Sequence, residues 1–288
     1  MTKLKIKNRL AQDRLMLWGV CLFAALTAVP LLAILGEVLL RGYDQLSWSF
    51  FTEPTPTAYK AMKAIEAGEP IPGGIANGII GTMIMLGMAV VVAVPAGILC
   101  GAFLAENPKN RFAQVVSYLT DLLQGTPSVI IGIITYIWVV VPMKGYSAFA
   151  GSVALFIMML PLIIRSTEET MKILPDTLKE AGLALGGSYW RVMLQVMLPS
   201  AFGSIFTGIL LAISRVVGET APLMFTALGG AAISWNMGKP MSAVPLLIWE
   251  FFNDPNLQSL IWGASLFLLT FVLCLNLLAK RIAKKWKI

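Results

Sequence analysis

The residues best suited to chemistry lie in one apolar stretch, SRVVGETAPL, which contains Arg215 and Glu219. Residues four apart share one face of a helix, so this spacing predicts an ion pair. Either charge alone in hydrocarbon would be costly, so both should face the protein interior or a wet cavity. A guanidinium presents five donors in a fork that suits a tetrahedral oxyanion. We interpret the pair as part of an anion pathway. The alternative is a structural ion pair that only locks helix packing.

Patterns of enzyme active sites are absent from the sequence. It has no G-x-x-x-x-G-K-[ST] phosphate loop, no G-x-S-x-G elbow and no carboxylates at metal-ligand spacing. It also has 0 histidines, which argues against imidazole catalysis and zinc sites. We therefore predict a non-enzymatic protein with no catalytic residue, cofactor or metal, and any ATP hydrolysis would belong to a partner subunit.

The composition is that of an integral membrane protein. Of the 288 residues, 57% are hydrophobic and 13% charged, and the mean hydropathy is +0.78. A helix needs about 17 apolar residues or more to cross a bilayer. Segments of that length predict an all-α protein with six transmembrane helices, at 15–40, 75–105, 115–142, 146–164, 199–222 and 259–279.

The net charge of +7 follows the topology and does not indicate a nucleic-acid partner. With a cytoplasmic N-terminus, sixteen basic residues fall inside, five fall outside, and Arg215 lies within a span. We therefore expect both termini in the cytoplasm, with a basic arm at 1–14 that favours anionic lipid, a transmembrane domain at 15–279 and a basic tail at 280–288. The first apolar run is too long for a signal-peptide core and is interpreted as a retained helix.

Three connecting or interrupted regions stand out. An external loop at 41–74 with a short helix at 57–67 either contacts a soluble partner or only connects two spans. Gly125-Thr126-Pro127-Ser128 interrupts the third span, and such a break can border a pathway. Asp121 precedes it near the cytoplasmic interface, where anchoring is favoured over transport. Ser166 to Glu169 has capping-box spacing and should start a cytoplasmic helix. The segment 241–252 is too short to span and fits an interfacial or re-entrant segment on the outer side of the membrane.

The stretch EAGLALGGSYWRVMLQVMLP, at 180–199, predicts two short helices joined at Gly186 and Gly187 within a cytoplasmic region, 165–198. Its order of residues resembles the EAA loop of the membrane subunits of ATP-binding-cassette importers, with Gly182 where alanine is usual and Val196 where isoleucine is usual. The resemblance implies docking to an ATPase. The residues to which this coupling is assigned are Leu178, Glu180, Ala181, Gly182, Leu185 and Gly186.

A closer resemblance covers most of the chain from Asp121 to Pro255. DLLQGTPSVIIGI, SRVVGETAPLMFTA and MSAVPLLIWEFFNDP are similar to segments of PstA-type permeases of bacterial phosphate importers. It implies a type I importer architecture in the bacterial inner membrane and a heterodimer with a second homologous permease. It further implies a cytoplasmic ABC ATPase dimer and an external phosphate-binding protein. The positions that it associates with phosphate passage are Arg215, Glu219 and Arg165.

Several alternatives stay open on the residues alone. Sulfate and molybdate offer the same oxyanion chemistry as phosphate. An ion-driven secondary transporter is a weaker alternative, because the sequence shows no paired-half repeat with matching broken helices. A membrane scaffold without transport activity would not need charges inside a span.

Overall fold

The computed structural model describes the backbone of residues 3–285 and the side chains of residues 12–284. The parts of the predicted basic arm and tail at 1–2 and 286–288 lie outside the described residues. Within the described chain the structure is helical, and Leu228 and Met241 form an isolated bridge. The elements are α1 (Lys3–Tyr43), α2 (Trp48–Thr52), α3 (Ala58–Glu66), α4 (Ala76–Glu106), α5 (Arg111–Gly125), α6 (Ser128–Thr135), the π-helix η1 (Tyr136–Val140), α7 (Val141–Met143), α8 (Ala148–Ile173), α9 (Asp176–Ala184), α10 (Tyr189–Val192), the π-helix η2 (Met193–Met197), α11 (Leu198–Val217), α12 (Ala221–Thr226), α13 (Val244–Asn253) and α14 (Leu260–Lys285).

The prediction of six spans is confirmed, with one of them bent. Five helices in the described chain are long and apolar enough to cross a membrane, and α5 with α6 to α7 forms a sixth span that bends by 107°. The fifth span differs from its predicted bounds. It runs without interruption over Tyr189–Val217, so the second helix of the predicted docking loop and the fifth span are one helix.

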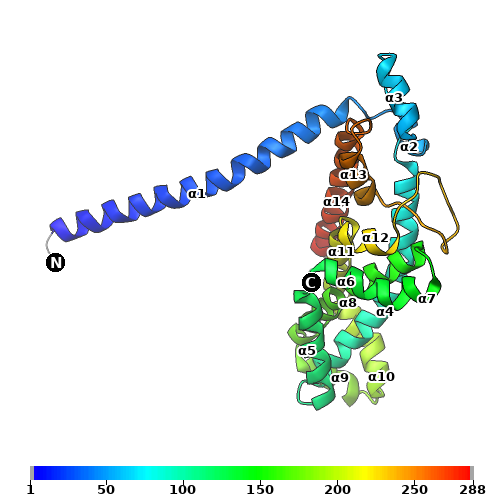
Figure 1. Ribbon diagram of the computed structural model, residues 1–288. Helices are drawn as coiled ribbons and strands as arrows, with labels where there is room; N and C mark the ends of the chain where they lie inside the picture. The colour runs from blue at the N-terminus through cyan, green and yellow to red at the C-terminus, as the bar shows by residue number, and fades with distance from the viewer. Residues whose placement is uncertain (1–2, 286–288) are drawn as a thin grey trace.

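The two ends of the helical body carry different elements (Figure 1). The short helices α2 and α3 lie at one end, and α9 and α10 lie at the other, with α4 extending between them. This separation fits a topology in which the loop at 41–74 and the segment that includes α9 face opposite sides of the membrane. The predicted helix at 57–67 is α3, and Thr57 caps it by accepting a hydrogen bond from the Lys60 amide at 3.5 Å.

Helix α1 extends away from the rest of the structure (Figure 1). It meets the body near its C-terminal end, where Gly42 packs against Trp262 and Leu266 of α14. The Arg41 guanidinium lies 5.0 Å from the Trp262 ring centroid. The apolar side chains along the rest of its described length are exposed, as expected of a span that faces lipid or another subunit.

The centre of the body is formed by α4, α8 and α11, whose glycines let the backbones approach closely. A side-chain carbon on Gly97 would lie 2.6 Å from a side chain of α8, and one on Gly101 would lie 2.6 Å from the Ile164 carbonyl oxygen. Gly208 of α11 lies directly against Ser166 of α8. Small residues at these positions therefore allow the close packing of α4 on α8 and of α8 on α11.

The short apolar helix α13 packs one face into the body, toward the end that holds α2 and α3 (Figure 1). Leu247 and Phe251 are fully buried, and Leu247 packs against Gly78 of α4. The Val244 amide donates to the Thr82 hydroxyl at 3.0 Å, which satisfies a buried backbone donor. A length of 10 residues excludes a full span, as predicted, and a re-entrant segment can be buried in this way.

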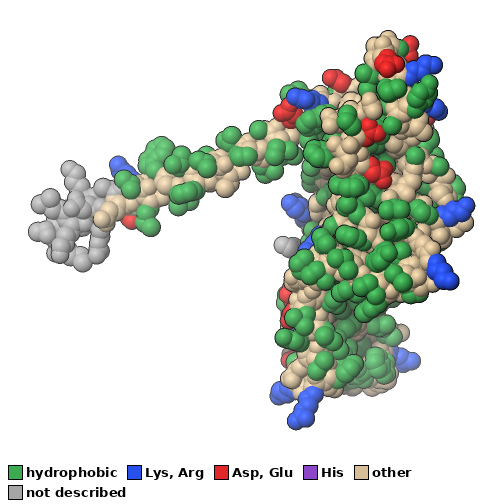
Figure 2. Space-filling view, viewed as in Figure 1, with side chains coloured by type: hydrophobic (Ala, Val, Ile, Leu, Met, Phe, Trp, Pro, Cys, Tyr) green, Lys and Arg blue, Asp and Glu red, His purple; other side chains and the backbone are tan. Residues whose placement is uncertain are grey.

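Side chains of different types occupy different parts of the visible surface (Figure 2). Acidic and basic groups gather around α3, basic groups lie at the end that holds α9, and hydrophobic groups cover much of the face between them. The cysteines at 21, 100 and 274 are free. Two of them, Cys21 and Cys274, are exposed on the isolated chain and not buried.

Candidate functional site

The break in the third span lies where the sequence predicted it. Helix α5 ends at Gly125 and α6 begins at Ser128. Pro127 has no amide hydrogen and disfavours helical geometry at the residue before it, and Thr126 is extended with φ −75° and ψ 129°. The Thr126 hydroxyl donates to the Leu122 carbonyl at 2.7 Å, and the Thr126 amide donates to the Leu123 carbonyl at 3.2 Å. These bonds satisfy part of the opened backbone within the protein.

Arg215 and Glu219 do not form the predicted ion pair. Arg215 lies in the last turn of α11, Gly218 caps that helix, and Glu219 follows beyond its end. Among the residues that the structure describes, Arg215 has no ion-pair or side-chain hydrogen-bond partner, and its side chain is exposed. The prediction of one shared face is wrong because helical spacing applies only while the helix continues. The guanidinium is consequently open to an external anion.

The structure brings Arg215 to the break in the third span. Arg215, Gln124 and Thr126 line one small pocket together with apolar residues of α6 and α8. Beside it, Gly132 of α6 packs so closely on Pro222 of α12 that a side-chain carbon would lie 2.8 Å from the proline Cα. The segments DLLQGTPSVIIGI and SRVVGETAPL, separate in sequence, therefore form one site.

Arg165 lies in a polar cluster between α5 and α8. Its Nε donates to Asp121 at 2.9 Å, Nη1 donates to Glu168 at 2.5 Å, and Nη2 donates to the carbonyl and hydroxyl oxygens of Ser117 at 2.8 and 2.9 Å. Lys172 also binds Glu168, with its Nζ 2.6 Å from the second carboxylate oxygen. Unlike Arg215, Arg165 is thus bound by two carboxylates and by the oxygens of Ser117.

One sequence prediction changes at this cluster. The expected capping box at Ser166 to Glu169 is wrong, because α8 continues without interruption from Ala148 to Ile173. Glu168 is instead a buried carboxylate, 5% exposed, that pairs with Arg165 and Lys172. Asp121 stays on the surface side, 60% exposed, and anchors α5 to α8 through Arg165. The pairs of Glu168 have local helical spacing, whereas the pair of Asp121 and Arg165 was not visible in the sequence because 44 residues separate them.

The Arg215 pocket and the Arg165 cluster are adjacent. A second, polar pocket of about 480 Å³ is lined by Arg165, its partners and Gln124. Gln124 also lines the small pocket that contains Arg215. Polar groups of α5 and α8 therefore extend from the broken span to Lys172 of α8, toward the end of the body that holds α9.

The predicted docking loop forms a compact unit in which the four apolar residues have different environments. Gly182 faces inward, since a side-chain carbon there would lie 2.9 Å from Val192 of α10. Leu178 is half-buried against the core, whereas Ala181 is exposed and Leu185 is 91% exposed. Leu185 is therefore the main apolar side chain that this segment exposes, and Glu180 is exposed as well. Gly186 adopts φ +80°, which permits the tight turn between the two helices.

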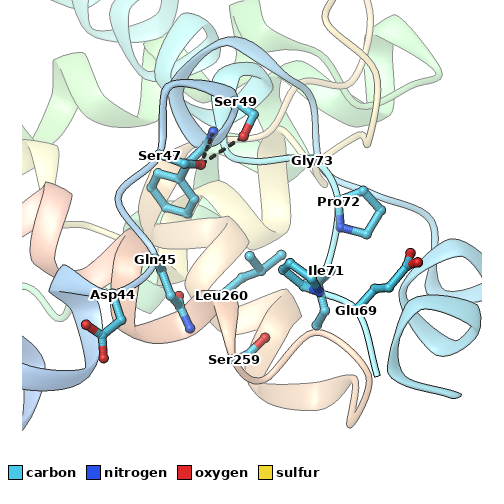
Figure 3. A pocket seen from close by; sticks show the side chains of 12 residues that line it. Asp44, Gln45, Ser47, Ser49, Glu69, Ile71, Pro72, Gly73, Ser259 and Leu260 are labelled. Atoms are coloured by element: carbon cyan, nitrogen blue, oxygen red, sulfur yellow. Dashed lines mark hydrogen bonds between the residues drawn. The ribbon is translucent and has the colours of Figure 1, made fainter. Parts of the chain in front are cut away.

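A pocket of about 580 Å³ opens at the opposite end of the body, far along the chain from these groups. Asp44, Gln45 and Ser47 line it together with the loop from Glu69 to Gly73 and the start of α14 (Figure 3). The Ser47 hydroxyl accepts from the Phe50 amide at 3.2 Å and lies 2.8 Å from the Ser49 hydroxyl. This pocket lies between the loop at 41–74 and the start of α14 and contains no basic side chain among its described lining.

Comparison with known proteins identifies the family. The sequence profile described as "Binding-protein-dependent transport system inner membrane component" matches residues 93–288. The chain belongs to this family. Within it, the relatives are phosphate transport system permease proteins of the PstA type. The protein from Haemophilus influenzae is 35% identical over 250 residues, which cover 86% of this chain and 85% of the relative.

Two other PstA relatives agree with this assignment. The protein from Yersinia pestis is 38% identical over 260 residues, covering 89% of this chain and 85% of that protein. PstA 1 from Mycobacterium tuberculosis H37Rv is 34% identical over 260 residues, covering 88% and 82%. The chain is therefore a multi-pass inner membrane permease of the PstA family, as the motifs around the broken span and α11 predicted.

Solved structures confirm the fold. A chain of the inward-facing MetNI methionine ABC transporter aligns with a TM-score of 0.58 at 16% identity, over 81% of this chain and 99% of its own length. A chain of a bacterial ABC transporter that imports alginate aligns with a TM-score of 0.59 at 13% identity, over 97% and 100%. At these identities the likeness concerns the architecture, which is that of the type I ABC importer permeases.

Proposed function

We propose that this chain is one of two permease subunits of an ATP-driven importer of inorganic phosphate and lines half of its pathway. The observation that carries the proposal is the unpartnered guanidinium of Arg215 beside the broken third span. The phosphate transport named for the PstA relatives supplies the substrate class. The proposal adds to the family assignment the residues that act on the anion.

Arg215 is the residue that we assign to direct contact with phosphate. An anion that leaves water for a narrow passage loses hydration, and a fixed cation lowers that barrier. The described chain offers no carboxylate that neutralises Arg215, and Glu219 is half-buried beyond the helix end. We assign Glu219 to the same passage, where it limits how tightly the anion is held.

Arg165 has a different assignment in this proposal. Its donors are already directed at Asp121, Glu168 and Ser117. An anion passing this point would meet a cluster in which carboxylates compete for the guanidinium. We therefore assign Arg165 to the cytoplasmic side of the pathway, where it joins α5 to α8 and favours release of the anion over retention.

Transport by purified complex tests the assignment of Arg215. Arg215→Gln should reduce uptake of radiolabelled phosphate into proteoliposomes, while assembly with the partner subunits is unchanged, since loss of a charge eases membrane insertion. Lys239→Gln is a matched control, because Lys239 is an exposed cation in the loop after α12. Normal uptake by an assembled Arg215→Gln complex would show that the arginine is structural.

The same preparation separates phosphate from other oxyanions. Phosphate, sulfate and molybdate share tetrahedral geometry, so the guanidinium alone does not select among them. We expect unlabelled phosphate to compete with radiolabelled phosphate and sulfate and molybdate to compete weakly. Equal competition by sulfate would contradict the assignment to phosphate. Uptake without ATP, driven by an ion gradient, would support a secondary transporter instead.

We also propose that the segment containing α9 docks on a cytoplasmic ATPase dimer. Leu185 supports this assignment because a leucine that is 91% exposed beside a glycine turn has no packing role within the chain. Such an exposed apolar residue fits a groove on a partner. Two other residues of the assigned set, Glu180 and Ala181, are also exposed. A second homologous permease, an external phosphate-binding protein and surrounding membrane lipid complete the proposed set of partners.

Substitution of Leu185 tests docking without disturbing the fold. Leu185→Glu should abolish co-purification of the ATPase or its stimulation, with the melting temperature of the permease unchanged. Gly182→Glu is unsuitable for this purpose, since its side chain would collide with Val192 and disturb the segment itself. Full ATPase stimulation in Leu185→Glu would exclude this surface as the docking site.

A further inference from the structure

Glu106 joins three helices at the end of the body that holds α9. It is the last residue of α4, and its side chain is 12% exposed. Its carboxylate forms an ion pair with Lys179 of α9 and accepts a hydrogen bond of 3.0 Å from the Tyr189 hydroxyl of α10. The Lys179 ammonium also lies 5.2 Å from the centre of the Tyr189 ring. One carboxylate thus closes a three-membered cluster.

This cluster connects α9 to a helix that is remote in sequence. Lys179 and Tyr189 lie 73 and 83 residues after Glu106. Along the chain, α9 continues only into α8 through Leu174 and Pro175 and into α10 through Gly186, Gly187 and Ser188. Glycines at such a junction permit changes of backbone angle. The carboxylate supplies a non-covalent connection to α4 across these flexible junctions.

Helix α4 can carry a displacement through the body. Near Glu106, Gly101 packs against α8, and farther along, Gly81 lies directly against the carbonyl of Ser242 before α13. Close contacts of this kind leave little free space, so a shift at one end of a rigid helix is passed to its neighbours. A movement of α9 that pulls Glu106 would therefore reach the buried segment at the opposite end.

We propose that Glu106 is the positioning residue that transmits movement of α9 to α4 during the transport cycle. This inference rests on the proposed function, in which an ATPase docks on α9. The ion pair with Lys179 and the hydrogen bond from Tyr189 keep the end of α4 attached to α9 and α10 when α9 moves. The partly buried position makes the pair less screened than an exposed surface pair.

The ratio of phosphate transported to ATP hydrolysed tests the connection in the assembled complex. We expect Glu106→Gln to lower this ratio about five-fold or more, the usual lower range for coupling between sites. Exchange of the two charges, Glu106→Lys with Lys179→Glu, should restore a large part of it. Tyr189→Phe keeps the ring and removes the hydroxyl, and should lower the ratio less. A ratio equal to wild type in Glu106→Gln, or no recovery in the exchange variant, would overturn the inference.

Spin-label distances measure the same connection without depending on the substrate. One label is placed at Gly87 in α4, where an added side-chain carbon would meet no neighbouring side chain or helix within 4 Å, and another at the exposed Thr177 in α9. Each is paired with a label at the exposed Leu273 in α14. ATP with vanadate should change both distances in wild type and only the α9 distance in Glu106→Gln. Movement of α4 in the Glu106→Gln complex would overturn the inference. If α4 responds as expected but phosphate is not imported, the assignment of the substrate is wrong and the role of Glu106 stands.

Discussion

Removal of the Arg165 guanidinium should destabilise the permease because it leaves the buried Glu168 carboxylate with Lys172 as its remaining cationic partner. The Glu168 side chain is 6% exposed, and its two carboxylate oxygens bind Arg165 at 2.5 Å and Lys172 at 2.6 Å. Removing one partner of a buried ion pair typically costs about 3–5 kcal/mol in the free energy of unfolding. Lys172 still binds the carboxylate in Arg165→Gln, so we expect a cost near the lower limit, about 3 kcal/mol.

The bond to Asp121 adds little to this value. Its side chain is 60% exposed, and exposed ion pairs contribute about 0–1 kcal/mol. A loss of about 3 kcal/mol corresponds to a fall of roughly 6–12 °C in melting temperature for a chain of this size. Because membrane proteins often unfold irreversibly, the wild type and the variants must be heated at one fixed scan rate in the same detergent.

A double-mutant cycle provides the decisive measurement. Glu168→Gln removes the charge that needs compensation, so Arg165→Gln in that background should cost much less than in wild type. Lys172→Gln is the control, and we expect a small effect from it because Lys172 is 48% exposed. If the losses caused by Arg165→Gln and Glu168→Gln simply add, the two residues do not compensate each other and the explanation fails.

The remaining predictions concern helix packing, pH and topology. Gly208→Ala should overpack the contact with Ser166, at a cost of about 1–3 kcal/mol, and so lower the melting temperature. Ser166→Gly in the same chain should restore the melting temperature, and Gly87→Ala, with open space around it, should leave it unchanged. A missing rescue would exclude the contact between α8 and α11. Burial raises the pKa of Glu250 above its ordinary value to about 7, against a hydrogen bond from Ser242 that lowers it. The folded state therefore holds a proton that the unfolded state loses, so stability should fall as pH rises toward about 7 and level off above it; Glu250→Gln should abolish this slope in melting temperature, and an unchanged slope would assign it to another group. In a chain without its native cysteines, Tyr59→Cys, exposed on α3, should react with an impermeant reagent added outside and Leu185→Cys should not; the reverse pattern would overturn the topology.

Local sequence features determined the number of spans and the position of the break. A long apolar run must form a helix in lipid to satisfy its backbone, so length and composition suffice to predict it. The bend at Thr126 and Pro127 likewise follows from the missing amide hydrogen and the restriction that proline places on the preceding residue. Capping by Thr57 and the turn at Gly186 were predictable for the same local reason.

The ion pairs between remote segments, Arg165 with Asp121 and Lys179 with Glu106, were decided by the tertiary structure. Spacing suggested that Glu219 pairs with Arg215, but α11 ends at Val217 and the two residues do not share a helix face. Capping rules suggested that Glu168 helps to start a helix, but α8 continues through it, and Glu168 pairs with Arg165 one turn earlier in the same helix. Ion pairs between remote segments depend on which helices are neighbours, and one sequence does not contain that information.

Depth and exposure were decided in the same way. A segment of 10 apolar residues fits a surface helix or a buried one, and α13 is buried because Gly78 and Gly81 of α4 leave room for it. Gly182 and Leu185 are spaced as on one helix face, yet Gly182 packs against Val192 while Leu185 stays exposed. Hydrophobic periodicity identifies the residues able to pack, and only the shape of the neighbouring helices determines which of them do so.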